Sequence, residues 1–241
     1  IQTSWVKPPN QINGLDHLAV QAPCINIYGQ LLPGITNVTD RARYYSFYPW
    51  IVWALEKEGL NFDNEFIELF RRADCLLTLI AERHAYITGT DKESHSGAMI
   101  GSLNMARQGV DVINQKIIQL SEYAHNNKDK SRYFKNELGG LGQYYLGVFR
   151  ELYIMTGSRR AGIANTKQYG YLLAEAMDKG VDRNLFIQTI REDNVTLARL
   201  DELAPFCPCY LTQNVDELSL LCDLFFVKGL LSKNVVNVGM R

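Results

Sequence analysis

Three groups of residues in this 241-residue chain have types and spacings that can carry chemistry. The first lies at a predicted helix start, where Arg41, Arg43 and Tyr44 follow Thr39 and Asp40. Guanidinium groups clamp phosphate or carboxylate, and the free amides of a helix start add to that attraction. This pattern predicts an anion-binding site. The alternative, which we favour, is that the arginines pair with nearby acids and lie over aromatic rings.

The second group is a set of thiols near the C-terminus, Cys207-Pro-Cys209 and Cys222, which together offer three ligands to zinc. Structural zinc sites usually pair ligands two to four residues apart and add a second pair, and no fourth ligand is apparent beside these three. The neighbouring Phe206 and Tyr210 indicate a buried turn instead. We therefore predict no metal and no cofactor.

The histidines are dispersed along the chain, and they do not form a motif of known chemistry: His17, His84, His95 and His125. His84 ends an apolar helical stripe, which indicates a partly buried side chain. His95 lies between two serines in a polar loop, where it either contacts a ligand or faces water. HExxH and GxSxG motifs are absent from the sequence, so it identifies no catalytic residue and leaves open whether the chain is an enzyme.

The third group is a basic block. Residues 128–167 carry 8 Lys and Arg against 3 Asp and Glu, while the whole chain has a formal net charge of −1. This block is where an anionic partner is electrostatically favoured. A helix at 133–138, a glycine turn, a helix at 143–153, a basic connector and a Thr166-capped helix resemble a winged helix-turn-helix.

In such a module one helix enters the major groove of DNA and basic residues contact phosphates. The residues predicted to bind nucleic acid are Lys135, Gln143, Tyr144, Arg150, Arg159, Arg160 and Lys167. A second interpretation stays open: the segment is a helical packing layer whose cations face water or a protein partner. The glycines and the apolar character of the helix favour that second interpretation.

Helical periodicity sets the fold class as all-α, or nearly so. We expect an irregular arm and an aromatic-rich helical bundle over 1–127, and a helical region over 128–241 with the winged-helix-like segment at 128–180. The expected helices run from Thr39 to Glu58, with a kink or restart at Pro49, and then over 63–89, 110–125, 166–180, 182–203 and 215–230.

The composition is that of an ordinary globular protein, with 46% hydrophobic and 21% charged residues. Apolar runs are far shorter than the roughly 20 residues of a membrane span, and no segment has signal-peptide character. The five scattered cysteines do not form the disulfide framework of a small secreted domain. We therefore expect a cytoplasmic protein without membrane association.

Three stretches also resemble a family of helical bacterial proteins with an LLPGxTNVTxRARYYSF-type signature. They are Leu32 to Phe47, Gly139 to Phe149, and Phe206 to Phe226 with its CPC turn. Such proteins are often encoded near mobile-element and anti-phage defence genes. The resemblance implies a non-catalytic, nucleic-acid-associated or scaffolding subunit of a protein complex. An enzyme acting on an anionic small molecule and a protein–protein adaptor are the alternatives.

Overall fold

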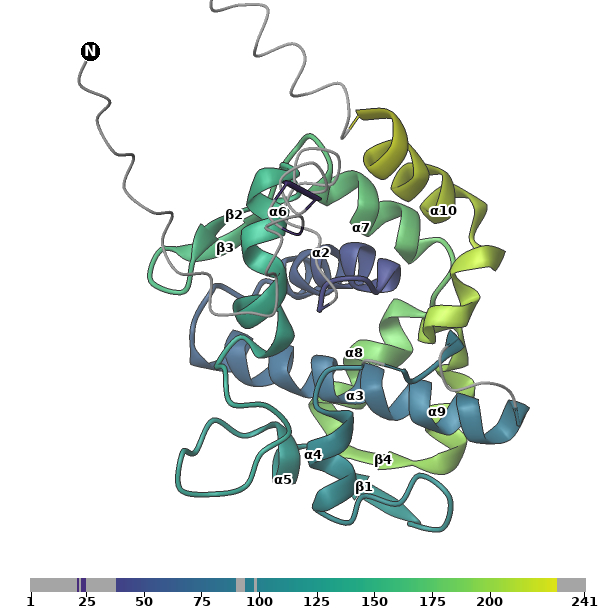
Figure 1. Ribbon diagram of the computed structural model, residues 1–241. Helices are drawn as coiled ribbons and strands as arrows, with labels where there is room; N and C mark the ends of the chain where they lie inside the picture. Colours follow the sequence, from purple (N-terminus) through teal and green to yellow (C-terminus); the bar gives the residue numbers. More distant parts are fainter. Residues whose placement is uncertain (1–20, 22, 25–37, 90–93, 98, 229–241) are drawn as a thin grey trace, which may run out of the picture.

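The computed structural model describes residues 21, 23–24, 38–89, 94–97 and 99–228 of the chain. This part is mostly helical, with two small antiparallel strand pairs, as the predicted helical class requires (Figure 1). Most of the predicted N-terminal arm, including most of the Leu32 to Val38 stretch of the signature, lies outside the described residues. In the described part of the chain, none of the helices combines the length and apolar character needed to cross a membrane.

Helix α2 (Ala42–Lys57) is the central element of the fold (Figure 1). Residues 43–55 are all buried, as the aromatic residues on every side of this helix predict. The helix continues through Pro49 and does not restart there. The Pro49 carbonyl accepts a hydrogen bond from Nδ2 of Asn165 at 2.8 Å, and α2 packs against α7 (Gly170–Asp178).

Helix α3 (Asn64–Thr88) has both of the ends that the sequence predicts. The Asp63 carboxylate accepts a hydrogen bond from the Phe66 amide at 3.0 Å, and Gly89 ends the helix with a left-handed φ of 59°. Helices α8 (Arg183–Glu192), α9 (Leu197–Glu202), α5 (Ser121–Ala124) and α4 (Ser102–Arg107) pack against α3. It therefore contacts elements from both halves of the chain.

Two predicted helices are wrong, and one strand pair explains both errors. Within 110–125 the chain forms turns, strand β1 (Ile117–Gln119) and the short α5. The predicted 182–203 helix is interrupted at Asp193, where φ is 68°, and continues as strand β4 (Asn194–Thr196). The two strands pair antiparallel with the buried Ile118 opposite the buried Val195. Pairing between such distant segments overrides local helical propensity.

The basic block has a different local structure from the one predicted. Residues 126–138 form no helix, so the expected helix at 133–138 is wrong. A π-helical turn η2 (Leu141–Tyr145) leads directly into α6 (Leu146–Glu151). Strands β2 (Met155–Ser158) and β3 (Gly162–Asn165) then form a hairpin. Its tip is the segment that the sequence predicts as a basic connector.

The C-terminal part consists of short helices. Two 3₁₀ helices, η3 (Ala204–Phe206) and η4 (Pro208–Gln213), precede α10 (Val215–Cys222) and the π-helical η5 (Asp223–Lys228). One hydrophobic core includes residues from both sides of the predicted boundary at residue 128. The β1–β4 pair also joins the two sides.

Candidate metal centre

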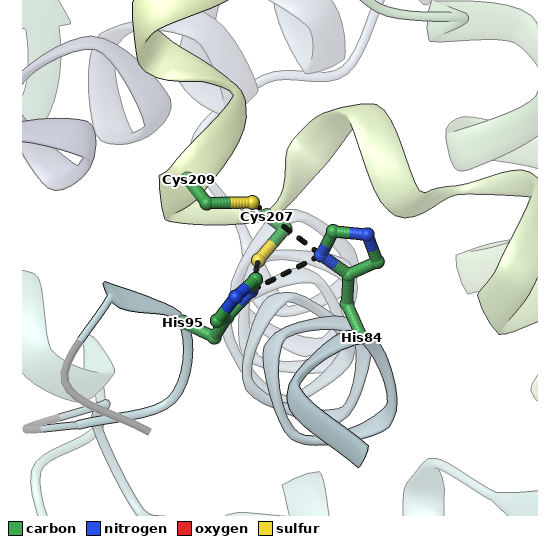
Figure 2. A group of neighbouring side chains, drawn as sticks. All are labelled: His84, His95, Cys207 and Cys209. Atoms are coloured by element: carbon green, nitrogen blue, oxygen red, sulfur yellow. Dashed lines mark hydrogen bonds between the residues drawn. The ribbon is translucent and has the colours of Figure 1, made fainter. Parts of the chain in front are cut away.

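Four metal-ligating side chains converge beside the C-terminal end of α3 (Figure 2). They are His84, His95, Cys207 and Cys209, and their ligand atoms all lie within 4.8 Å of one another. They come from three separate segments of the chain. Figure 2 shows the four side chains pointing toward one another from these segments.

The end of α3 places the two imidazoles together. His84 lies in the last turns of the helix, and the left-handed Gly89 ends the helix five residues later. The described segment 94–97 carries His95, whose side chain is buried. The Nδ1 atoms of the two rings are 3.1 Å apart, and the ring centroids are 4.9 Å apart.

The proline-bracketed turn places the two sulfurs. Cys207 has an extended backbone (φ −57°, ψ 142°) because it precedes Pro208, and this residue separates η3 from η4. The Cys207 amide donates to the Ala204 carbonyl at 2.8 Å, and the Tyr210 amide donates to the Cys207 carbonyl at 3.0 Å. The two short helices thus hold Cys207 and Cys209 on the same side of the turn as the imidazoles.

The distances between ligand atoms match the edges of a small coordination tetrahedron. Sγ of Cys207 lies 3.4 Å from Nδ1 of His95, and Sγ of Cys209 lies 3.4 Å from Nδ1 of His84. Zinc bonds of about 2.0–2.1 Å to nitrogen and about 2.3 Å to sulfur place tetrahedral N–N pairs about 3.3 Å apart and N–S pairs about 3.5 Å apart. These three edges of the cluster are therefore close to those of a zinc site.

Protons alone satisfy these contacts poorly. A neutral imidazole carries one proton, yet each Nδ1 faces both the other Nδ1 and a sulfur. A metal cation accepts a lone pair from all four atoms at once. Burial and the nearby His95 hold the pKa of His84 below its ordinary value, which keeps the imidazole in the neutral form that binds metals.

The cysteines are protonated at neutral pH when no cation binds them. Burial raises the pKa of Cys207 to about 12 and also raises the pKa of Cys209. A metal ion replaces these protons, because the thiolate is the form that coordinates.

A contact between His95 and Thr88, which is not a ligand, supports coordination of the metal through Nδ1 of His95. Nε2 of His95 lies 3.5 Å from the Thr88 hydroxyl, which also donates to the His84 carbonyl at 2.8 Å. Coordination through Nδ1 leaves the ring proton of His95 on Nε2, facing that hydroxyl. Four protein ligands also fill a tetrahedral shell and leave no position for substrate or water, which is the pattern of structural zinc sites.

The predicted anion site is divided by the structure between surface and core. Arg41 is the half-buried residue that precedes α2, whereas Arg43 and Tyr44 are only 2% and 1% exposed. Nε of Arg43 lies 3.2 Å from Oε1 of Glu217, and the Tyr44 hydroxyl accepts from the Ile100 amide at 3.0 Å. Arg43 and Tyr44 are therefore part of the buried core, and the acid that pairs with Arg43 comes from α10 rather than from nearby in the sequence.

Most of the predicted nucleic-acid residues are exposed, but they do not share one helix face. Arg150, Arg159 and Arg160 lie at or beside the β2–β3 hairpin, and Lys167 follows it. The Arg150 guanidinium donates to the Gly157 carbonyl, and Arg159 pairs with Glu137. Lys135 and Gln143 are exposed on the preceding segments, while Tyr144 is half-buried against Phe134.

Sequence reasoning does not connect the two histidines with the thiol pair. It considers Cys222 as the third ligand, but Cys222 is exposed on α10 and is not part of the cluster. The signal that identifies the site consists of two pairs of residues: two histidines on either side of a helix-ending glycine, and a Cys-Pro-Cys turn. The second pair follows the first by more than a hundred residues, which no local spacing rule covers.

Comparison of the chain with protein-family models, with curated proteins and with solved structures finds no match. The assignment of this centre therefore depends on the geometry and the chemistry of its own residues.

Proposed function

We propose that this chain is a zinc-binding helical protein whose Cys₂His₂ centre is structural. One observation carries the proposal: the ligand atoms of His84, His95, Cys207 and Cys209 all lie within 4.8 Å of one another. Two sulfur and two imidazole ligands in a tetrahedron select zinc among the common divalent metals. The centre ties the 94–97 segment and the CPC turn to the end of α3.

The first experiment is the metal content of the protein, purified without a histidine tag and measured by plasma mass spectrometry. We expect about one zinc per chain, as a single Cys₂His₂ set requires. The Cys207→Ser, Cys209→Ser double variant should lose it. Cys222→Ser is the matched control, because this exposed thiol lies outside the cluster, and it should keep its zinc. A wild-type protein that contains no zinc and binds none when zinc is added would refute the proposal.

A second candidate function is nucleic-acid association through the β2–β3 hairpin. Arg159 and Arg160 are exposed at its tip, and Arg150 supports it from α6 by donating to the Gly157 carbonyl. This places three cations around one protruding hairpin, as in the basic wing of a winged-helix module. The missing helix at 133–138 removes the usual helix-turn-helix, so this candidate rests on phosphate contacts alone.

The test is a fluorescence-anisotropy titration with mixed-sequence duplex DNA at low and at moderate salt. Binding should weaken steeply with salt, and Arg159→Ala with Arg160→Ala should reduce it. Lys179→Ala with Arg191→Ala removes the same charge from other surface positions and should leave most of the affinity. Equal binding by the two folded double variants would exclude the hairpin as the DNA-binding element.

In either case we propose a non-catalytic subunit that works within a larger assembly. The resemblance to proteins encoded near bacterial defence and mobile-element genes supports a scaffolding role in such a complex. An enzyme site built on Arg41, Arg43 and Tyr44 is less favoured, because two of these three side chains are buried.

A further inference from the structure

Arg43 is a buried cation with part of its hydrogen-bonding capacity unused. Its side chain is 2% exposed, and its Nη2 donates to the Pro205 carbonyl at 3.1 Å. Its Nε lies 3.2 Å from Oε1 of Glu217, so the charge is neutralised from that side. Among the described residues, however, Nη1 has no hydrogen-bond partner, although it is buried. Buried guanidinium N–H groups normally have a partner, so this one requires an explanation.

The guanidinium that carries the unused donor contacts the backbone next to the candidate metal centre. The carbonyl bound by Arg43 belongs to Pro205, two residues before the ligand Cys207. The Arg43 guanidinium is therefore held against the start of the turn that carries both ligand sulfurs.

We propose that Arg43 is a positioning residue of the metal centre, with Nη1 donating a hydrogen bond to a metal-bound thiolate of the CPC turn. This proposal rests on the zinc centre proposed above. A protonated thiol is a weak acceptor, whereas a metal-bound thiolate carries negative charge and accepts well from a guanidinium. Metal binding thus supplies the partner that Nη1 lacks. Arg43 in return favours the metal-bound form.

The same side chain connects the metal centre to α10. Glu217, in the first turn of α10, is fully buried and also accepts from the Ser46 hydroxyl and from Nδ2 of Asn214, the latter at 3.1 Å. Asn214 in turn caps α10 by accepting from the Glu217 amide. A shift of the guanidinium toward the thiolates therefore reaches the start of α10 through one ion pair.

The test compares zinc affinities by competition with a chromophoric chelator. Removing Arg43 alone leaves the Glu217 carboxylate buried without its counter-charge, so the informative pair is Arg43→Met with Glu217→Gln against Glu217→Gln alone. We expect the double variant to bind zinc about 10–100-fold more weakly, the usual effect of losing an outer contact to a ligand. Ser46→Ala removes a hydroxyl that contacts the Glu217 carboxylate and the Arg43 backbone carbonyl but leaves the guanidinium in place, so it should bind zinc as Glu217→Gln does.

A spectroscopic readout separates this role from general support of the fold. In the Co²⁺-substituted protein, the sulfur-to-metal charge-transfer bands report the electron density on the thiolates. They should shift in the Arg43→Met, Glu217→Gln variant and in Arg43→Lys, which keeps the charge but not the planar guanidinium. They should stay unchanged in Glu217→Gln and in Ser46→Ala.

The outcomes distinguish the two proposals. Absence of metal binding in the wild-type protein refutes the zinc centre itself. Normal binding by the wild type, with equal affinity and identical cobalt spectra in all Arg43 variants, leaves the zinc centre intact and refutes the role of Arg43. Arg43→Lys decides the question by its spectrum if the double variant does not fold.

Discussion

Asp74 should make the stability of this protein depend on pH in the direction opposite to that of most carboxylates. Its side chain is fully buried in α3 and accepts hydrogen bonds from the Tyr48 hydroxyl at 3.0 Å, the Tyr133 hydroxyl at 2.9 Å and the Gly140 amide at 3.2 Å. Burial raises its pKa from 3.8 to about 6, against the opposing effect of these donors and of Arg71. The folded protein therefore binds this proton more tightly than the unfolded chain does.

The sign and the size of this pH effect on the free energy of unfolding follow from the difference between the folded and unfolded pKa values of Asp74. Because the folded pKa is the higher one, the stabilising contribution of the Asp74 proton is fully present below pH 3.8 and is lost as the pH rises through about 6. A difference of one pKa unit corresponds to about 1.4 kcal/mol, so the two values predict a loss of about 2 kcal/mol between roughly pH 4.5 and pH 7.5. Asp74→Asn removes the titrating group and keeps an acceptor for the tyrosine hydroxyls.

The assay is urea unfolding of the wild type and of Asp74→Asn across that pH range. The difference between their free energies of unfolding isolates Asp74 from the other carboxylates. It should move by about 2 kcal/mol in favour of Asp74→Asn as the pH rises. Tyr48→Phe removes one donor to the carboxylate and should shift the transition to higher pH. A difference that is flat with pH, or that moves in favour of the wild type, would refute this account of the network.

Three further changes test the candidate zinc centre and the buried polar contacts around Arg71 and Gly140. If free zinc starts about 1,000-fold above its Kd, removing it with a chelator should lower the melting temperature of the wild type by roughly 8–16 °C in differential scanning fluorimetry. The melting temperature of Cys209→Ser should not change on chelation. Arg71→Met should cost at least about 4 kcal/mol in urea unfolding, because the guanidinium donates to five backbone carbonyls of 124–137. Gly140→Ala should cost about 1–3 kcal/mol in the same assay, since its new methyl group would lie 2.5 Å from the Tyr48 hydroxyl.

Local signals predict the elements whose ends are determined locally. The Asp63 cap and the Gly89 terminator of α3 are both confirmed, because each acts within one turn of the helix. The predicted helix over 182–203 is wrong because its interruption has a distant cause. The Asp193 carboxylate accepts from the Ser121 amide at 2.7 Å, across 72 residues of sequence, and β4 pairs with β1 beside it. No window of neighbouring residues contains that partner.

The ligands of the candidate site also differ in how visible they are in the local sequence. The CPC turn is visible in the sequence as a closely spaced thiol pair, so Cys207 and Cys209 are candidate ligands there, although the sequence alone predicts no metal. The imidazoles cannot be identified as ligands in this way, because His95 and Cys207 are 112 residues apart and meet only after α3 has packed against the C-terminal helices. The role of Arg43 is equally hidden, since an arginine at a helix start is as typical of an exposed anion site as of a buried ion pair.

Two polar side chains of α3, Arg71 and His84, contact segments that lack long regular helices or strands. A segment without regular secondary structure carries backbone groups that need partners, so apolar packing alone does not fix it. Arg71 supplies donors to the carbonyls of 124–137, and His84 supplies a ligand to the centre that fixes the CPC turn. The two residues are 13 positions apart on one helix, which is about 20 Å at 1.5 Å per residue. Within the described part of the chain they share no partner across that distance, so losses of stability at the two points should add rather than compensate.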